Sequence, residues 1–441
     1  MVELLTGSVT IRGLLLTIFR GATSRCPLRP KLSSIYGGKP QVTRWVRCVV
    51  RAARSGGFTL SRGLAALVVV AVLLPGHAKA GVAPADHAGM PRTFTLAFTG
   101  DVLSHAPVTR QAAAHGAAGG GGYDYRPMFA AVSPILMAAD LAICHLETPL
   151  SRDNSDLSSW PLFNVPFELA DALAYAGYAG CSTASNHALD ARPEGVAATL
   201  DHLDRAGVGH AGTARAAQEA ASSRLYEARG VTVGHLSYTY GLNGLTLPAD
   251  QPWAVSLIDA VRILIEAHRL RAAGAEFVVV SLHWGAEYQS SPTAEQVTLA
   301  HQLLPSPDID LIVGHHAHVV QPVERIESEY VIYGLGNFLS NQSAACCAAG
   351  AQDGVIVEVS VTEGATPGTF VAETVTFTPT WVDRRDYKIL PVALALAEPD
   401  LDPGRRATLQ ASWDRSVGVL TSLAAPGLRA GIVQTNAGVP T

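Results

Sequence analysis

The sequence predicts a layered α/β fold in which two β-sheets are packed together. From residue 94 to residue 314, short apolar segments alternate with longer segments of helical periodicity, and from Tyr330 onward the pattern changes to strands alone. Such alternation followed by a strand-rich end is typical of an α/β body whose last strands complete a second sheet. In addition, polar residues follow the ends of several apolar segments, which places a functional site at one edge of the fold.

The individual elements follow from apolar periodicity and from the residues that end each run. The predicted strands are short and rich in apolar residues, and they lie at 94–98, 140–144, 181–185, 231–240, 277–282, 311–314, 330–333, 355–361 and 369–377. The predicted helices lie at 128–139, 167–176, 195–206, 256–273 and 293–304. A glycine run at 116–122 predicts a flexible loop, and residues 394 to about 423 are predicted to be helical.

The net charge of −5 hides two segments of opposite charge. Residues 1–80 hold twelve of the 32 basic residues and one of the 37 acidic residues, so residues 81–441 are strongly acidic. An acidic body lacks the positive surface that phosphate backbones require, which argues against nucleic acid as a partner.

The basic segment leads into an apolar run that is typical of a secretory signal. Residues 64–74 are uncharged and apolar, several arginines precede them, and Ala78-Lys79-Ala80 has the small residues of a cleavage site. A membrane-spanning helix needs about 17–25 apolar residues, so a stable anchor is the weaker interpretation. We therefore expect residues 1–80 to be an unstructured basic N-terminus with a signal sequence, and the protein to be exported across the cytoplasmic membrane. It would be secreted, or retained at the membrane if the signal is not cleaved; a basic N-terminal domain is the alternative.

An exported location permits disulfides, but the sequence leaves the pairing of the cysteines open. The cysteines that follow residue 80 are Cys144, Cys181, Cys346 and Cys347.

Polar residues lie at or just after the C-terminal ends of five predicted strands. They are Asp101, Glu147, Asn186, His187, His283, His315, His316 and His318. Ligands bind at this edge of α/β sheets, so the coincidence predicts one shared site. Each position also has an ordinary explanation, such as a turn for Asp101, a helix N-cap for Asn186 or a core histidine for His283.

The residue types in this set predict a metal centre. Two carboxylates, one amide and at least three imidazoles suit one or two ions of Mn²⁺, Fe or Zn²⁺ rather than Ca²⁺, which prefers oxygen ligands alone. His316 and His318 lie two positions apart, so both project to one side of an extended chain. His187 can act as a general acid, and His145 faces the same side as Glu147 if its strand continues. The sequence contains neither a P-loop nor a serine-hydrolase motif.

The motifs that surround these residues resemble those of a known family. In chain order they are Thr99-Gly100-Asp101-Val102, His145-Leu146-Glu147-Thr148-Pro149, Asn186-His187-Ala188-Leu189-Asp190, His283-Trp284-Gly285-Ala286-Glu287-Tyr288, Gly314-His315-His316-Ala317-His318 and Leu335-Gly336-Asn337-Phe338. This set resembles the CapA, or poly-γ-glutamate capsule biosynthesis, family, which belongs with the calcineurin-like metallophosphoesterases. The resemblance covers about residues 93–383 and implies one metallophosphoesterase-like domain, a four-layer αββα sandwich with two mixed sheets. It leaves residues 384–441 as a C-terminal helical extension.

The resemblance also implies a role for most of the polar residues. Asp101 and His318 would bind a first metal, and Glu147 would bridge it to a second. Asn186, His283 and His316 would bind that second metal. His187 and Asn186 would form the catalytic pair, with His187 protonating the leaving group.

Four positions depart from the family pattern. Leu103 stands where metallophosphoesterases have a metal-binding histidine, and His145 stands where the capsule family has asparagine. Ser185 replaces another asparagine and Ala317 replaces a proline, and His315 is an extra histidine with no assigned role.

Two functions are therefore expected from different classes. In the first, the chain is an exported metal-dependent hydrolase of capsule poly-γ-glutamate biosynthesis that uses metal-activated water on a phosphoester or an anionic polymer. In the second, it is a non-catalytic component that binds or exports the polymer. Membrane-bound capsule-synthesis proteins are further expected partners.

Overall fold

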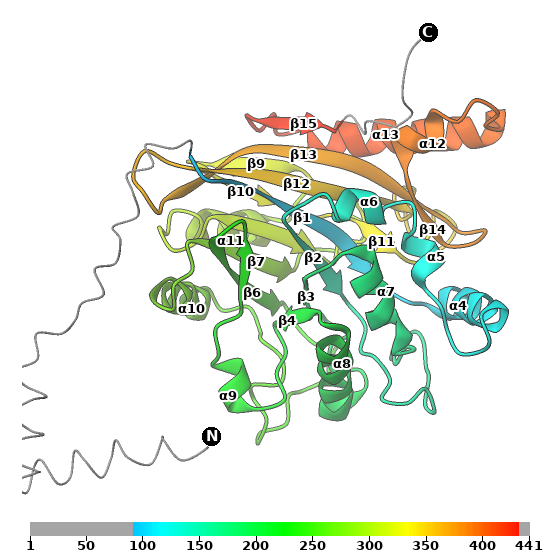
Figure 1. Ribbon diagram of the computed structural model, residues 1–441, viewed down its shortest axis with the longest axis horizontal. Coiled ribbons are helices and arrows are strands. Elements are labelled where there is room, and N and C mark those ends of the chain that lie inside the picture. Colours follow the sequence, from blue (N-terminus) through cyan, green and yellow to red (C-terminus); the bar gives the residue numbers. More distant parts are fainter. Residues whose placement is uncertain (1–90, 432–441) are drawn as a thin grey trace, which may run out of the picture. The chain divides into compact units, whose positions relative to one another are not determined.

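The structure is a computed structural model that describes residues 91–431 of the 441-residue chain. The described residues form an α/β body with two sheets (Figure 1). The predicted basic segment and signal at 1–80 lie outside the described residues. Among residues 91–431, no helix has the length and apolar composition needed to cross a membrane.

The first sheet has the strand order β14-β13-β12-β1-β2-β3-β4. Its parallel strands are β1 (Thr93–Val102), β2 (Leu141–Leu146), β3 (Gly180–Ser182) and β4 (Gly209–Ala211). Its antiparallel strands are β12 (Asp353–Glu363), β13 (Phe370–Asp383) and β14 (Lys388–Pro391). Two short strands join it, β11 (Asn337–Leu339) beside the end of β1 and β15 (Leu428–Ala430) beside β13.

The second sheet has the strand order β5-β6-β7-β8-β10-β9. Its parallel strands are β6 (Val231–Thr239), β7 (Phe277–His283), β8 (Leu311–His315) and β10 (Glu329–Ile332). The two outer strands are antiparallel to their neighbours, β5 (Leu225–Ala228) and β9 (Val323–Ile326).

The strands are buried on both faces because each sheet packs on the other and on helices. On β7, Phe277 and Val279 face the first sheet, and Val278 and Val280 face the helices of their own side, as the two-residue period of a strand requires. Apolar side chains thus fill the space between the sheets and both outer faces.

The helices form the two outer layers. The helices on the first sheet are α4 (Ala106–Ala118), α5 (Arg126–Phe129), α6 (Ser133–Leu136), α7 (Glu168–Ala176) and α8 (Arg192–Ala206). The helices on the second sheet are α10 (Ala260–Ala272) and α11 (Ala294–Leu303). A short helix, α9 (Ala217–Ala220), lies between β4 and β5 in the sequence. The predicted four-layer αββα sandwich with two mixed sheets is therefore confirmed.

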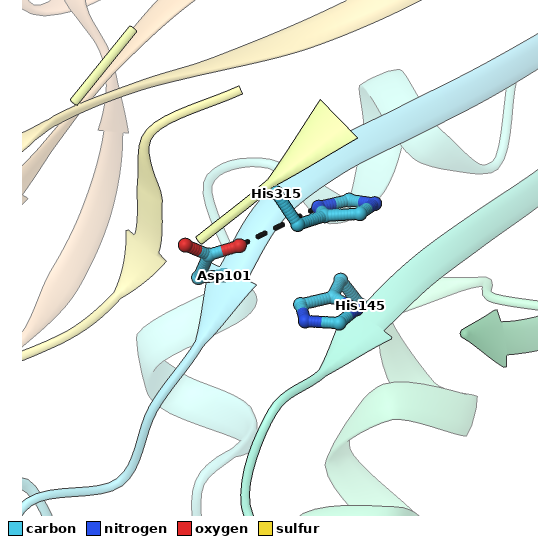
Figure 2. Close-up of side chains that lie close together, drawn as sticks. All are labelled: Asp101, His145 and His315. Carbon is cyan, nitrogen blue, oxygen red and sulfur yellow. Dashed lines mark ion pairs between the residues drawn. The ribbon is translucent and has the colours of Figure 1, made fainter. Parts of the chain in front are cut away.

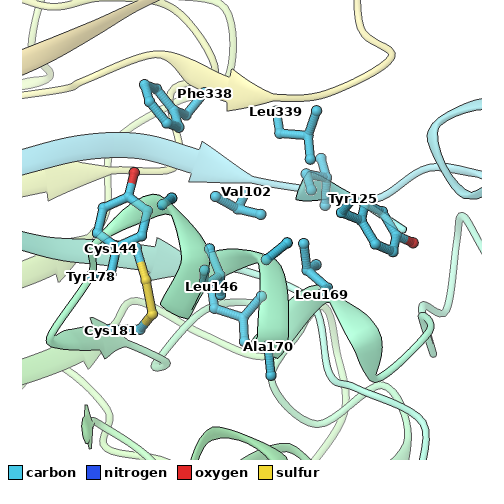
Figure 3. Packing of buried hydrophobic residues seen from close by; sticks show 14 of the residues in the cluster. Val102, Tyr125, Cys144, Leu146, Leu169, Ala170, Tyr178, Cys181, Phe338 and Leu339 are labelled. Carbon is cyan, nitrogen blue, oxygen red and sulfur yellow. A yellow bond between two sulfur atoms is a disulfide. The ribbon is translucent and has the colours of Figure 1, made fainter. Parts of the chain in front are cut away.

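The core under the first outer layer contains a disulfide. Cys144 and Cys181 face each other in the register of β2 and β3, with their Cα atoms 4.4 Å apart, and their sulfur atoms are bonded among apolar side chains of α7 and β1 (Figure 3). A second disulfide joins the adjacent Cys346 and Cys347.

Several local predictions differ from the structure. The single helix expected at 128–139 is two short helices, because Pro127 and Pro134 each occupy a first turn and neither can continue a preceding helix. The loop expected at 116–122 begins only after α4, which extends to Ala118.

The C-terminal segment contains more than the expected helices. It has α12 (Val392–Leu396) and α13 (Pro403–Leu420), which pack on β13, but also β14 and β15, which pair with β13 (Figure 1). Its strands therefore belong to the first sheet.

Candidate metal centre

The eight polar residues predicted from strand ends converge where the carboxyl ends of the two sheets meet. The first sheet supplies Asp101 at the end of β1, Glu147 after β2, and Asn186 and His187 after β3. The second sheet supplies His283 at the end of β7 and His315, His316 and His318 at and after the end of β8. All eight are buried, and His187 is the most accessible at 8%.

A bulge in β1 directs Asp101 into this site. The register between β1 and β2 shifts between Phe98 and Asp101. The register between β1 and β11 shifts directly after Asp101. Gly100 permits the close approach, because a Cβ atom there would lie 2.0 Å from the carbonyl oxygen of Gly336. Bulges redirect side chains in this manner beside functional sites.

The backbone after β8 is strained where it presents its histidines. His316 (φ 90°) and His318 (φ 55°) both adopt left-handed conformations, which cost about 1–3 kcal/mol each for residues other than glycine. The amide of His316 donates to Asp101 Oδ2 at 3.2 Å and holds the turn in place. The strained conformation of His316 is thus stabilised by its hydrogen bond to the carboxylate of Asp101.

Asp101, Glu147 and His318 form the first group of potential ligands. His318 Nδ1 lies 3.0 Å from Asp101 Oδ2, and His318 Nε2 lies 3.6 Å from Glu147 Oε1. The ligand atoms of the three residues lie within 4.8 Å of one another. Both carboxylate oxygens of Glu147 are buried without a hydrogen-bond partner among the described residues, which is costly for an acidic group.

In this group the imidazole of His318 lies between the carboxyl groups of Asp101 and Glu147, and the three side chains shift one another's pKa. Burial would raise the pKa of Asp101, but contacts with His315 and His318 outweigh it and hold that pKa well below its usual range. Burial raises the pKa of Glu147 well above its usual value, against the pull of His318. Although burial opposes its charged form, Glu147 and Asp101 raise the pKa of His318 to about 9. A cation at this position would take over the charge that the proton of His318 supplies.

Asn186, His283 and His316 form the second group. Asn186 Oδ1 lies 2.9 Å from His283 Nε2, and the ring centres of His283 and His316 are 4.7 Å apart. Burial lowers the pKa of His283 well below its usual value, and burial lowers the pKa of His316 to about 3. Both rings are therefore neutral at physiological pH, which is the form that binds metals.

Two further histidines, His145 and His315, lie between these groups. Their rings stack with centres 4.1 Å apart, and His315 Nδ1 lies 3.4 Å from Asp101 Oδ1 (Figure 2). Ligand atoms of His145, His315 and Asp101 also lie within 4.8 Å of one another. His145 forms hydrogen bonds with Ser182 Oγ at 2.7 Å and with His283 Nδ1 at 2.9 Å.

His187 lies beside the second group and is oriented by a buried carboxylate. Its Nδ1 atom is 2.7 Å from Asp190 Oδ2, which also accepts a hydrogen bond from the amide of Phe163 at 2.8 Å. The ring of Phe163 meets His187 edge-on at 4.8 Å. This pairing leaves Nε2 as the atom of His187 that can exchange a proton.

Sequence reasoning missed two residues at this edge, Tyr240 and Asn243. Asn243 Oδ1 accepts a hydrogen bond from Asn186 Nδ2 at 3.1 Å, and the ring of Tyr240 lies 4.6 Å from that of His316. Both residues follow the end of β6, so the strand-end criterion that found the other residues could have found them.

The donor set fits a transition metal. Neutral imidazoles, an amide oxygen and carboxylates converge from two sheets, and the unpartnered oxygens of Glu147 lie among them. This mixture of ligands is typical of Mn²⁺, Fe and Zn²⁺ sites.

The fold and the site together define a two-sheet α/β protein with a potential metal centre at the carboxyl ends of its strands. Comparison with protein families matches residues 95–342, more than half of the chain, to the bacterial capsule synthesis protein PGA_cap family. The chain therefore belongs to this family, as the motifs predicted.

Curated relatives carry the same association. The chain is 26% identical over 268 residues to the capsule biosynthesis protein CapA of Bacillus anthracis, covering 59% of this chain and 63% of that protein. It is 26% identical over 252 residues to the PGA biosynthesis protein CapA of Bacillus subtilis, covering 56% of this chain and 64% of that protein. The match thus spans less than two-thirds of the length of either relative.

Solved structures with a similar fold include two proteins of low identity. One is a 5'-nucleotidase precursor from Thermus thermophilus, with 15% identity and a TM-score of 0.41, covering 74% of this chain and 59% of that one. The other is the calcineurin-like phosphoesterase YfkN from Bacillus subtilis, with 11% identity and a TM-score of 0.39, covering 76% of this chain and 99% of that one.

Proposed function

We propose that the chain is an exported component of capsule poly-γ-glutamate biosynthesis that hydrolyses a phosphoester or γ-glutamyl bond at a divalent metal centre. The observation that carries this proposal is Glu147, whose two buried oxygens have no hydrogen-bond partner among the described residues and lie beside Asp101 and His318. A buried carboxylate of this kind is stable only with a cation or a proton.

Two groups of residues would hold the metal. Asp101, Glu147 and His318 would bind one ion, and Asn186, His283 and His316 would bind a second if two are present. Mn²⁺, Fe and Zn²⁺ are the ions that suit these donors. Such ions lower the pKa of water toward neutrality and offset the negative charge of the scissile group.

His187 would supply the proton to the leaving group, and neighbouring side chains orient its ring. Asp190 holds the Nδ1 atom of His187, so that Nε2 can deliver a proton to the leaving group. Asn243 Nδ2 lies 3.4 Å from His187 Nδ1, and Asn243 Oδ1 accepts a hydrogen bond from Asn186 Nδ2. His187 and Asn186 would then face the same bound group.

The substrate class follows from charge and from the relatives' names. A body with an excess of acidic residues would repel an anionic polymer unless cations at the site offset the charge. The relatives named for capsule and PGA biosynthesis support such a polymer as the substrate, and membrane-bound capsule-synthesis proteins as partners.

Export is supported by the predicted signal at 64–80 and by the disulfide between Cys144 and Cys181, since disulfides persist in oxidising compartments. N-terminal sequencing of the protein from its native host tests this step. We expect the mature chain to begin at Gly81; a mature chain that begins at Met1 in the cytoplasm would contradict export.

The hydrolase proposal is tested by metal analysis together with turnover of an aryl phosphate. The purified chain should contain about one to two transition metal ions, and chelation should abolish turnover. His187→Ala should reduce turnover and leave the metal content nearly unchanged. Metal-free protein as active as the metal-loaded protein would refute the proposal.

A second candidate, a non-catalytic polymer-binding or export component, is favoured by Leu103. This residue replaces a metal-binding histidine and lies buried in the hydrophobic core under the first outer layer, at 2% exposure. Metal-loaded protein that binds poly-γ-glutamate but hydrolyses neither the polymer nor an aryl phosphate would support this candidate instead.

A further inference from the structure

We propose that His145 is a positioning residue that keeps the Nε2 atom of His283 available to a metal ion. The inference rests on the proposed metal centre and extends it to His145 and Ser182, residues outside both proposed ligand groups. Its basis is a chain of hydrogen bonds that crosses from the first sheet to the second and back.

The chain has four side chains in series. Ser182 Oγ on β3 lies 2.7 Å from His145 Nδ1 on β2, and His145 Nε2 lies 2.9 Å from His283 Nδ1 on β7. The opposite atom of His283, Nε2, lies 2.9 Å from Asn186 Oδ1. All four residues are buried, at 1% exposure or less, so water cannot replace a missing partner.

The orientation of the Asn186 amide is fixed at one end of the chain. Its Nδ2 atom donates to Asn243 Oδ1 at 3.1 Å, which leaves Oδ1 facing His283. Because Oδ1 only accepts hydrogen bonds, His283 Nε2 must either donate a proton to it or share a cation with it through its lone pair.

The protons of the chain can run in either of two directions. In the first, Ser182 donates to His145 Nδ1, His145 Nε2–H donates to His283 Nδ1, and His283 Nε2–H donates to Asn186. In the second, His283 Nδ1–H donates to His145 Nε2, and His145 Nδ1–H donates to Ser182 Oγ. His283 Nε2 then carries a lone pair that faces Asn186 Oδ1, and these two atoms are the ligands proposed for the second ion.

The hydroxyl of Ser182 makes both directions possible. In the second direction Ser182 accepts from His145 and donates its own hydrogen to the carbonyl oxygen of Cys144, which lies 3.3 Å away. Every polar atom of the chain therefore has a partner in the first state, and also in the second when an ion binds His283 Nε2 and Asn186 Oδ1. His283 can thus release Nε2 to an ion without leaving a buried donor or acceptor unpaired.

The surrounding rings prevent His145 from turning away. Its ring centre lies 4.1 Å from that of His315 and 4.9 Å from that of His283, and both rings stack on it. The imidazole is therefore held by the rings at the ends of β8 and β7. Partners that orient a metal-binding histidine through its other nitrogen alter metal affinity by about 10–100-fold when they are removed.

The test measures metal affinity in variants of the full-length chain. His145→Leu removes both hydrogen bonds and should weaken Zn²⁺ or Mn²⁺ binding by about 10–100-fold in a competition titration. His145→Gln has an amide that can donate or accept at the place of Nε2, and it should retain most of the affinity. The matched control is His235→Leu, because His235 is an equally buried histidine that contacts Ser281 and belongs to neither ligand group.

A spectroscopic readout separates positioning from a loss of structure. In protein labelled with ¹⁵N-histidine, adding Zn²⁺ should move the proton of His145 from Nε2 to Nδ1. An unchanged His145 proton position on Zn²⁺ binding, or a His145→Leu variant that binds as tightly as wild type, would overturn the inference and leave the metal centre standing. Wild-type protein that binds no ion would overturn the metal centre, and this inference with it.

Discussion

The substitution Glu147→Gln tests the proposed metal centre with opposite expectations for the metal-free and the metal-loaded protein. Without metal, Glu147 is a buried acid whose oxygens have no hydrogen-bond partner among residues 91–431, and burial raises its pKa well above the usual value. Glutamine has nearly the same shape as the acid and carries no charge whose burial must be offset, so the metal-free variant should unfold at the temperature of the wild type or slightly above it. The metal-loaded variant should lose most of the stabilisation that metal gives the wild type.

The size of the effect follows from linkage. An ion present at a thousand times its Kd stabilises the folded state by about 4 kcal/mol. The 341 residues that the structure describes have an unfolding entropy of about 0.7 kcal/mol/K, at about 2.1 cal/mol/K per residue. The wild-type Tm should therefore rise by about 6 °C. If the loss of one carboxylate ligand weakens binding about 100-fold, the same metal concentration stabilises the variant by about 1.4 kcal/mol, or about 2 °C.

The assay is thermal unfolding of chelator-treated wild type and variant, with and without Mn²⁺ or Zn²⁺. The exposed Glu295 on α11 offers a matched control, since Glu295→Gln removes the same charge at a residue outside both proposed ligand groups and should keep the full shift. A Glu147→Gln variant that shows the wild-type shift would refute the assignment of Glu147 as a ligand.

Three further predictions concern the residues that support the site and the fold. Asp190→Asn removes the charge that holds His187 Nδ1. The loss of this charge-assisted hydrogen bond should lower kcat for an aryl phosphate by about 10–100-fold and leave the metal content unchanged. An unchanged kcat would contradict this role. Burial raises the pKa of Asp310 to about 6 against the pull of Arg271, so stability should fall as pH rises from about 4 to about 6, and urea unfolding of Asp310→Asn should show a flatter profile over that range. Arg415→Ala leaves the buried carboxylate of Asp353 with Ser412 alone and should destabilise the fold by about 3 kcal/mol, the lower end for a broken buried pair because 38% of the Arg415 side chain is exposed. Lys388→Ala, which breaks an exposed pair with Asp386, should cost less than about 1 kcal/mol in the same urea titration.

The sequence predicted which side chains converge at this edge because the signal is local to each strand. Asp101 and His283 each end a run of buried apolar residues, and parallel strands present their ends at one edge of a sheet. That rule does not depend on which strands are neighbours. The edge could therefore be predicted without knowing the strand order of either sheet.

Contacts between the sheets could not be predicted in this way. His145 and His283 are 138 residues apart in sequence and meet only because β2 and β7 face each other across the inter-sheet core. Short strands were missed for a related reason: β4 and β11 have three residues each, too few to show a two-residue period, and their pairing partners hold them in place.

The two sheets share the proposed metal ligands, so the distance between the sheets would set the geometry of the centre. Apolar side chains such as Phe98 on β1 and Val313 on β8 fill the space between the sheets up to the edge. His315 lies two positions after Val313 on β8. Close-packed interiors resist small displacements, so the ligand atoms of both sheets have nearly fixed separations before any ion binds. The hydrogen bond between His145 and His283 continues the contact between the sheets into the site. We expect the hydrogen bond between His145 and His283 to help hold the two halves of the proposed centre together. Leu103, which follows β1 and packs in the outer core, takes no part in that bridge.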